Sequence, residues 1–137
     1  MENKQKIIVS GILETENGIL LAKRPLTKKI APGIYHLPGG HVEFGETPEE
    51  ALVREFMEEF YLKIKVLDII RAFSYCIAHT HTIGITYKII VDSIPEEIEF
   101  DKKETEQIDW VDEMKLDNYL KQEDHDYDTL KKYFLTK

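Results

Sequence analysis

Three glutamates near the middle of the chain have a spacing that suits metal chemistry. Glu55, Glu58 and Glu59 stand at positions i, i+3 and i+4, so on a helix their carboxylates share one face. Such like charges repel by roughly a few tenths of a kcal/mol per exposed pair, and a hard divalent cation that binds the oxygens would remove the repulsion. Mg²⁺ typically takes a few carboxylates, several waters and substrate phosphates. The spacing alone fits either a metal platform or an acidic, solvated helix face.

The residues around these glutamates predict the helix that would carry them. Thr47 can cap the free amides, Pro48 suits the first helical position, and Glu50 can complete a capping box. At 100° per residue, one apolar arc lies apart from the glutamates, with small Ala51 among the acids. The sequence therefore predicts a helix from Thr47 to about Phe60. Its packing arc would be Leu52, Val53, Phe56, Met57 and Phe60.

A glycine turn stands directly before this helix and favours the metal interpretation. Pro38-Gly39-Gly40 follows a short apolar segment at 34–37 and predicts a sharp change of backbone direction. Such a turn would bring a flexible backbone segment close to the acidic face.

The rest of the chain indicates an α+β protein. Asn17-Gly18 predicts a hairpin between strands at 7–13 and 19–22. Because strands and helices do not alternate, we expect a mixed sheet covered on both faces, in a single domain over 1–137. The further strands are expected at 34–37, 64–70 with a continuation at 72–78, 82–91 and 108–111, and two helices at 112–120 and 127–134.

Composition limits the partners. The chain carries 18 basic and 26 acidic residues, a net charge of −8, which argues against binding nucleic-acid polymers or membranes through bulk charge. A small phosphorylated substrate remains compatible if metal ions bridge the like charges. Cys76 is the single cysteine, so no intrachain disulfide can form, and we expect its thiol to be buried. With no signal-peptide pattern and no run of transmembrane length, a cytoplasmic protein is expected.

From Gly40 to Leu62 the sequence resembles the Nudix box of the Nudix hydrolases, and it is similar to their MutT-like members. The family pattern is glycine, five residues, glutamate, seven residues, then Arg-Glu-apolar-any-Glu-Glu-any-Gly-apolar. Tyr61 departs from it, because the family has glycine there; either tyrosine accepts a left-handed conformation or the helix ends differently. The matching positions are Gly40, Glu46, Arg54, Glu55, Phe56, Glu58, Glu59 and Leu62.

The resemblance implies a loop-helix-loop catalytic motif on an α/β/α sandwich with a central mixed sheet. It also implies hydrolysis dependent on Mg²⁺ or Mn²⁺, with Glu46 and Arg54 holding loop and helix together. A further acid often joins the metal ligands, and Glu106 or Glu104 could serve. The ligands implied by position are Gly40 through its carbonyl, Glu55, Glu58 and Glu59.

Several residues outside the acidic set are candidates for substrate binding. Arg24 ends a strand near the box and could meet phosphates, as could the backbone at Gly39 and Gly40. Tyr35 and Phe73 could stack on a nucleobase, because an aromatic face accepts any base. Aromatic residues at such positions more often belong to the core.

The resemblance favours a nucleoside triphosphate as substrate, cleaved to a monophosphate and pyrophosphate, with an oxidised nucleotide such as 8-oxo-dGTP as one option. The alternative enzyme is a nucleotide-sugar or ADP-ribose pyrophosphatase. Family members of that kind tend to have a proline some 15 residues after the box, and none stands between Leu62 and Ile94. A sensor domain that binds a nucleotide without hydrolysing it is the alternative of another class, and the sequence leaves a homodimer open.

Overall fold

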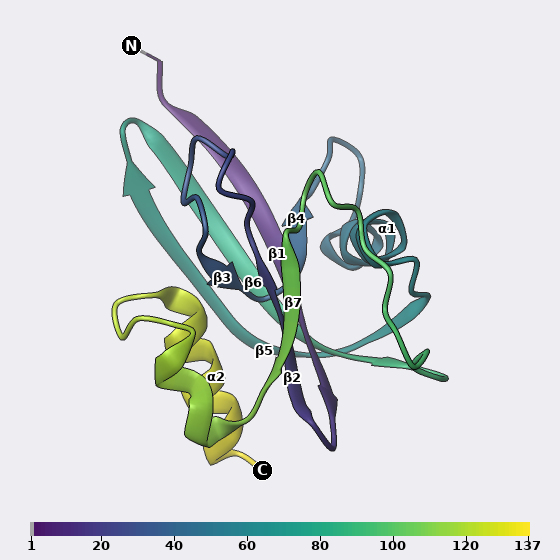
Figure 1. Cartoon of the computed structure of the whole chain (residues 1–137). Coiled ribbons are helices and arrows are strands. Elements are labelled where there is room, and N and C mark those ends of the chain that lie inside the picture. Colours follow the sequence, from purple (N-terminus) through teal and green to yellow (C-terminus); the bar gives the residue numbers. More distant parts are fainter. Residues whose placement is uncertain (1) are drawn as a thin grey trace.

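The computed structural model describes residues 2–137, which form one mixed β-sheet with a helix on each face (Figure 1). The helices are α1 (Pro48–Phe60), a 3₁₀-helix η1 (Glu113–Asn118) and α2 (His125–Leu135). The strands are β1 (Lys4–Thr15), β2 (Gly18–Lys23), β3 (Tyr35–His36), β4 (Gly39–His41), β5 (Ile64–Ile77), β6 (Thr80–Val91) and β7 (Gln107–Val111).

The sheet is mixed, as the sequence predicts. Its strand order is β3-β2-β1-β6-β5, with β4 paired to β1 and β7 paired to β2. β1 and β6 run parallel from Lys4↔Thr80 to Leu13↔Ile89, and the other pairs are antiparallel. The predicted α+β class is confirmed.

Alternation along β1 divides the core in two. Val9 and Leu13 pack with Phe56 of α1 on one face, whereas Ile12 packs with Leu130 of α2 on the other. Neighbouring strand residues point to opposite faces, so a single strand supplies both clusters. α1 and α2 therefore cover opposite faces of the sheet, and the site residues on each helix stand on a rigid support (Figure 1).

The glycine segment before α1 continues as a strand beyond the predicted turn. Gly39 and Gly40 belong to β4 and pair with Ser10 and Val9 of β1. A Cβ added at Gly39 would overlap the carbonyl oxygen of Val9, so no larger residue fits there. The segment is thus held against the middle of the sheet beside α1.

Helix α1 begins as predicted but packs on a different arc. The Thr47 hydroxyl accepts from the Glu50 amide, and the Glu50 carboxylate accepts from the Thr47 amide, completing the capping box. Ala51 is fully buried, whereas Val53 and Met57 are 37% and 44% exposed. The assignment of Val53 and Met57 to the packing arc is therefore wrong, whereas the side of the helix that carries Ala51 packs against the sheet. The small side chain lets the helix approach the sheet closely and turns the packing arc towards Ala51.

Two other expectations are corrected by the tertiary structure. Cys76 is exposed near the end of β5, which is an edge strand of the sheet. The predicted helix at 112–120 is the shorter 3₁₀-helix η1. Within residues 2–137, neither α1 nor α2 combines the length and the apolar character of a membrane-crossing helix.

Tyr61 ends α1 in the left-handed conformation that the family glycine would adopt. Its φ and ψ are 53° and 32°, and its amide donates to the Met57 carbonyl over 3.1 Å. The next amide, that of Leu62, donates to the Phe56 carbonyl over 3.4 Å. The bond from Tyr61 to Met57 spans four residues, so the helix ends in an αL cap, and the tyrosine accepts its backbone strain.

Replacement of Tyr61 by glycine should relieve this strain. A left-handed non-glycine residue costs about 1 kcal/mol, and the 59% exposed ring contributes little packing. We expect Tyr61→Gly to raise the free energy of unfolding by up to about 1 kcal/mol in chemical denaturation. Tyr61→Ala, which removes the ring but keeps Cβ, should not gain stability. A glycine variant less stable than the alanine variant would contradict this account.

Candidate active site

The carboxylates of α1 face one hollow of about 410 Å³ beside β4. Four parts of the chain meet there: α1, the residue after β2, the segment from β3 to the loop after β4, and the acidic loop before β7. The amide of Asp101 donates to the Glu59 carbonyl over 2.8 Å, which ties the acidic loop to the end of α1. The hollow, called the acidic cleft below, is lined by Arg24, His36, Gly39, Gly40, His41, Glu43, Arg54, Glu55, Glu58, Glu59, Asp101 and Glu104.

Arg54 connects helix and loop through most of its donors. Its Nε and Nη2 donate to the two carboxylate oxygens of Glu46 over 2.7 and 3.0 Å. Nη1 donates to Glu55 over 2.9 Å and to Glu58 over 3.2 Å, and Nη2 also reaches the His41 carbonyl over 2.9 Å. The planar guanidinium supplies donors in a rigid fork, which suits this bidentate pairing.

Glu46 fixes the loop between β4 and α1, where it accepts the bonds from Arg54. Its carboxylate also accepts from the Glu43 amide over 2.9 Å, while its own amide donates to the Glu43 carbonyl over 3.0 Å. Bonds from Arg54 and Glu43 lower the pKa of the Glu46 carboxyl. Glu46 and Arg54 thus lie in the geometry expected of residues that hold the loop against the helix.

Gly40 allows the Glu55 carboxylate to lie directly on the backbone of β4. A Cβ at Gly40 would overlap that carboxylate, so glycine is required for this approach. Burial raises the pKa of Glu55, and the contact with Arg54 partly offsets the rise. The pair forms the inner wall of the cleft.

Glu59 is the most perturbed acid in the cleft. Burial is the main cause and raises its pKa to about 8, with further contributions from Glu55, Glu104 and Asp101. A buried carboxylate beside other acids is unfavourable unless a cation compensates it. The charge distribution therefore suits a bound cation.

The donor set fits a hard divalent ion, although the side chains are arranged around Arg54. Carboxylate and carbonyl oxygens are the ligands that Mg²⁺ and Mn²⁺ prefer. Across residues 2–137, no three acidic, histidine or cysteine side chains already converge on a single point. Glu55 and Glu58 each give an oxygen to Arg54, so binding an ion through them requires side-chain rotation.

Of the two acids considered for the further metal ligand, the structure places only Glu104 in the cleft. Glu104 pairs with Lys28 over 3.1 Å at the surface. Glu106 instead pairs with Lys23 over 3.2 Å, outside the cleft, while its amide is bonded to the Lys23 carbonyl. The two acids precede β7 in the acidic loop, and the backbone bond from Glu106 to Lys23 holds Glu106 beside β2, away from the cleft.

The candidate substrate residues divide between two hollows. Arg24, Gly39 and Gly40 line the acidic cleft, and Arg24 is oriented by a 2.9 Å bond from its Nε to the Ile30 carbonyl. Tyr35 and Phe73 instead line a neighbouring hollow of about 530 Å³, which we call the aromatic pocket. His36 lines both, so the two hollows adjoin at β3.

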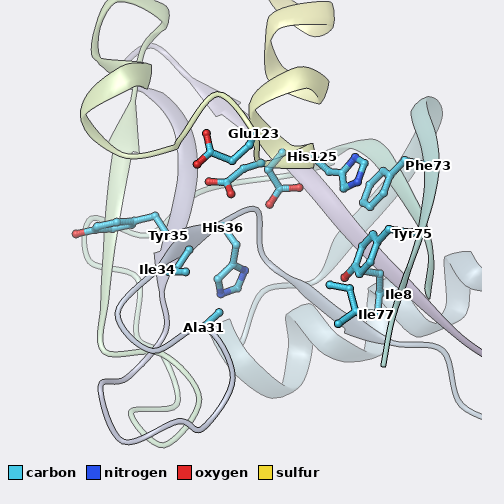
Figure 2. A pocket seen from close by; sticks show the side chains of 12 residues that line it. Ile8, Ala31, Ile34, Tyr35, His36, Phe73, Tyr75, Ile77, Glu123 and His125 are labelled. Atoms are coloured by element: carbon cyan, nitrogen blue, oxygen red, sulfur yellow. The ribbon is translucent and has the colours of Figure 1, made fainter. Parts of the chain in front are cut away.

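Figure 2 shows the two walls of the aromatic pocket, with Phe73 and Tyr75 on one side and Tyr35 and His36 on the other. His125, at the start of α2, stacks on Phe73 with ring centroids 4.3 Å apart. The tip of the Phe73 ring lies over Gly84, where a Cβ would overlap it. Phe73 is thus fixed between sheet and helix.

Sequence reasoning missed several residues around these hollows, four of which carry titratable side chains with a place in the argument. Asp101 lines the acidic cleft, and His36, His125 and Asp126 line the aromatic pocket. Burial raises the pKa of Asp126 and lowers that of His36. The acidic composition of its loop was an available signal for Asp101, and the position beside the glycine turn was one for His36. Nothing local marks His125 or Asp126, because α2 reaches the pocket only through packing.

Comparison with known proteins was made on both sequence and structure. The chain is 33% identical over 118 residues to a protein named nucleoside triphosphatase NudI from Enterobacter sp., covering 79% of this chain and 82% of that protein. It is 47% identical over 68 residues to an ADP-ribose pyrophosphatase of Methanocaldococcus jannaschii, covering 50% of this chain. An 8-oxo-dGTP diphosphatase of Proteus vulgaris is 37% identical over 65 residues, or 47% of this chain. These last two matches span only 39% and 57% of the relatives' lengths.

The fold agrees with solved structures. A MutT protein from Methanosarcina mazei Go1 superposes with a TM-score of 0.83 at 20% identity, over 99% of this chain and 97% of that one. A NUDIX hydrolase from Nitrosomonas europaea gives a TM-score of 0.79 at 18% identity, over 98% and 91% of the two chains. A family model described as the NUDIX domain matches residues 4–133. The resemblance read from the box is thereby confirmed, and this chain belongs to the Nudix family, with a MutT-like fold.

Proposed function

We propose that this protein is a metal-dependent pyrophosphohydrolase that cleaves a nucleoside triphosphate with water to a nucleoside monophosphate and pyrophosphate. The observation that carries the proposal is the cluster of Glu55, Glu58, Glu59 and Glu104 in one cleft beside Gly40. Pyrophosphate hydrolysis needs neutralised phosphate charge and an activated water. Membership of the Nudix family and the NudI relative support the same reaction class.

The residues of the cleft take distinct roles in this proposal. Glu55, Glu58, Glu59 and the Gly40 carbonyl would hold Mg²⁺ or Mn²⁺, with Glu104 in place of Glu106 as the further acid. When bound, the ion would neutralise phosphate oxygens and lower the pKa of a water. Arg54 and Glu46 keep the loop against the helix.

The substrate would lie across both hollows. Arg24 in the acidic cleft is placed to meet phosphate oxygens, and the aromatic pocket beyond His36 offers a wall for the base. Of the two aromatic candidates, Phe73 is better placed for that role, because the Tyr35 ring points away from Phe73 in Figure 2 and its hydroxyl donates to Asp109 over 2.7 Å. Phosphates and base would then be bound at the same time on opposite sides of β3.

Removal of the box carboxylates tests the site. Glu58→Gln and Glu59→Gln should each lower metal-dependent turnover by roughly a hundredfold or more, because each removes a ligand or base. Glu97→Gln, at an exposed loop glutamate, is the matched control and should leave turnover unchanged. Pyrophosphate release with Mg²⁺ is the measurement. If both box variants keep turnover within about twofold of the original, the assignment is wrong.

Metal binding should also be visible without turnover. Glu59 is buried beside other acids, so saturating Mg²⁺ should raise the melting temperature of the natural protein by about 3 °C or more. Glu59→Gln replaces a buried carboxyl group whose ionisation is disfavoured without metal, so its metal-free form should unfold at the same temperature or higher. Its gain with Mg²⁺ should be smaller. Equal gains in both proteins would argue against Glu59 as a ligand.

An ADP-ribose pyrophosphatase is the second candidate, favoured by the 47% identity over 68 residues to such an enzyme. A panel of canonical and oxidised nucleoside triphosphates, nucleotide sugars and ADP-ribose separates the two. We expect kcat/KM to be highest for a triphosphate. Higher values for ADP-ribose, with AMP and ribose 5-phosphate as products, would favour the alternative. Binding of nucleotides without turnover of any would favour a sensor.

A further inference from the structure

A lysine from outside the acidic cleft is paired with one of the carboxylates of the cleft. Lys28 Nζ donates to Glu104 Oε2 over 3.1 Å, and the two residues stand 76 positions apart in the chain. Glu104 lines the cleft, whereas Lys28 is not among the lining residues. The ammonium group therefore stands beside the cleft, within hydrogen-bond distance of its wall.

Backbone contacts fix both of the loops that carry this pair. The amide of Lys28 donates to the Pro25 carbonyl over 3.2 Å, in the loop after β2. The amide of Glu104 donates to the Asp101 carbonyl over 3.1 Å, in the acidic loop. Both side chains therefore start from defined positions, and the pair can open through rotation of the side chains alone.

The acidic cleft has few positive groups for a substrate that carries several negative charges. Six carboxylates and two arginines line it. Arg54 is already bonded to Glu46 and Glu55, so Arg24 is the lining cation that has no carboxylate partner within residues 2–137. Like charges repel unless a cation stands between them. A further cation at the rim would therefore favour the binding of phosphates.

Lys28 has the properties of a side chain that can change partners. Its ammonium group is a point charge with three donors on a flexible stem, and lysine is a common phosphate ligand. The side chains of Lys28 and Glu104 are 29% and 50% exposed, and ion pairs with such exposure contribute little stability. A divalent ion that binds the Glu104 carboxylate can therefore displace the ammonium group.

We propose that Lys28 neutralises Glu104 in the metal-free protein and binds a substrate phosphate once Glu104 has bound a metal ion. This inference rests on the proposed function for the positions of the ion and the phosphates. A phosphate bridged to an ion on Glu104 would lie within reach of Nζ, which starts 3.1 Å from that carboxylate. Lys28 is thus a phosphate-binding residue that also limits metal binding before the substrate arrives.

Loss of the ammonium group should change two affinities in opposite directions. Lys28→Met keeps an unbranched apolar side chain and removes the charge. Its affinity for Mn²⁺ alone should rise roughly two- to fivefold, because Glu104 has lost a competing partner. Its affinity for inorganic pyrophosphate with saturating Mg²⁺ should fall roughly fivefold or more, because a charged donor to the phosphates is lost. Electron paramagnetic resonance measures free Mn²⁺, and calorimetry measures pyrophosphate binding.

Lys23→Met is the matched control for this change. Lys23 pairs with Glu106 over 3.2 Å and joins the end of β2 to the same acidic loop, but outside the cleft. The variant loses the same charge and a similar ion pair, so both affinities should stay as in the natural protein. Lys28→Arg keeps a cation and should also stay close to the natural protein. If Lys28→Met and Lys23→Met have equal effects, the pair only fastens the loop and the proposal is overturned.

Glu104→Gln tests the competition between the two cations directly. In this background, Lys28→Met should no longer raise the affinity for Mn²⁺, because the carboxylate for which lysine and metal compete is gone. It should still lower the affinity for pyrophosphate. In the protein with Glu104 intact, an unchanged or lower Mn²⁺ affinity of Lys28→Met contradicts the exchange of partners.

These measurements separate this inference from the proposed reaction, because neither of them needs turnover. Opposite changes of the two affinities in Lys28→Met, with no nucleotide hydrolysed by the natural protein, would reject the reaction and support the exchange. Hydrolysis by the natural protein, with both affinities unchanged in Lys28→Met, would support the reaction and reject the exchange. Absence of Mn²⁺ binding by the natural protein would reject both.

Discussion

The guanidinium of Arg54 is the interaction on which the geometry of the acidic cleft depends. It binds Glu46 with two donors and reaches Glu55, Glu58 and the His41 carbonyl with the others. One cation thereby offsets several carboxylates that would otherwise repel one another and joins a loop to a helix. These contacts are only partly exposed to solvent, so they are screened less than surface ion pairs.

The carboxylates of the cleft that Arg54 does not bond favour the binding of a cation. Arg54 bonds Glu46 and one oxygen each of Glu55 and Glu58, but within residues 2–137 it forms no hydrogen bond or ion pair with Glu59, which lies near Asp101 and Glu104 instead. A protein with a net charge of −8 can bind phosphates only where a positive group stands between the like charges. Arg24 is one such positive group in the cleft. A cation bound at Glu59, the buried acid near the end of α1, would be another.

Both hollows depend on the short segment from β3 to β4. Gly39 and Gly40 bring its backbone against β1 and Glu55, while the amide of Leu37 bonds to Asp126 of α2. The helices lie on opposite faces of the sheet, yet this segment contacts groups from each. Its backbone is therefore the physical link between the carboxylate helix and the pocket proposed for the base.

Local signals account for most of what the sequence alone determined. The capping box at Thr47, the carboxylate spacing of Glu55, Glu58 and Glu59, and the hairpin at Asn17-Gly18 depend on residues a few positions apart, so they can be read without a fold. Tertiary structure decided the burial of Ala51, the exposure of Cys76, the position of Glu104 rather than Glu106 in the cleft, and the meeting of His36 with Asp126. These outcomes depend on how closely a helix approaches the sheet and on contacts between segments far apart in the chain, which no local pattern records.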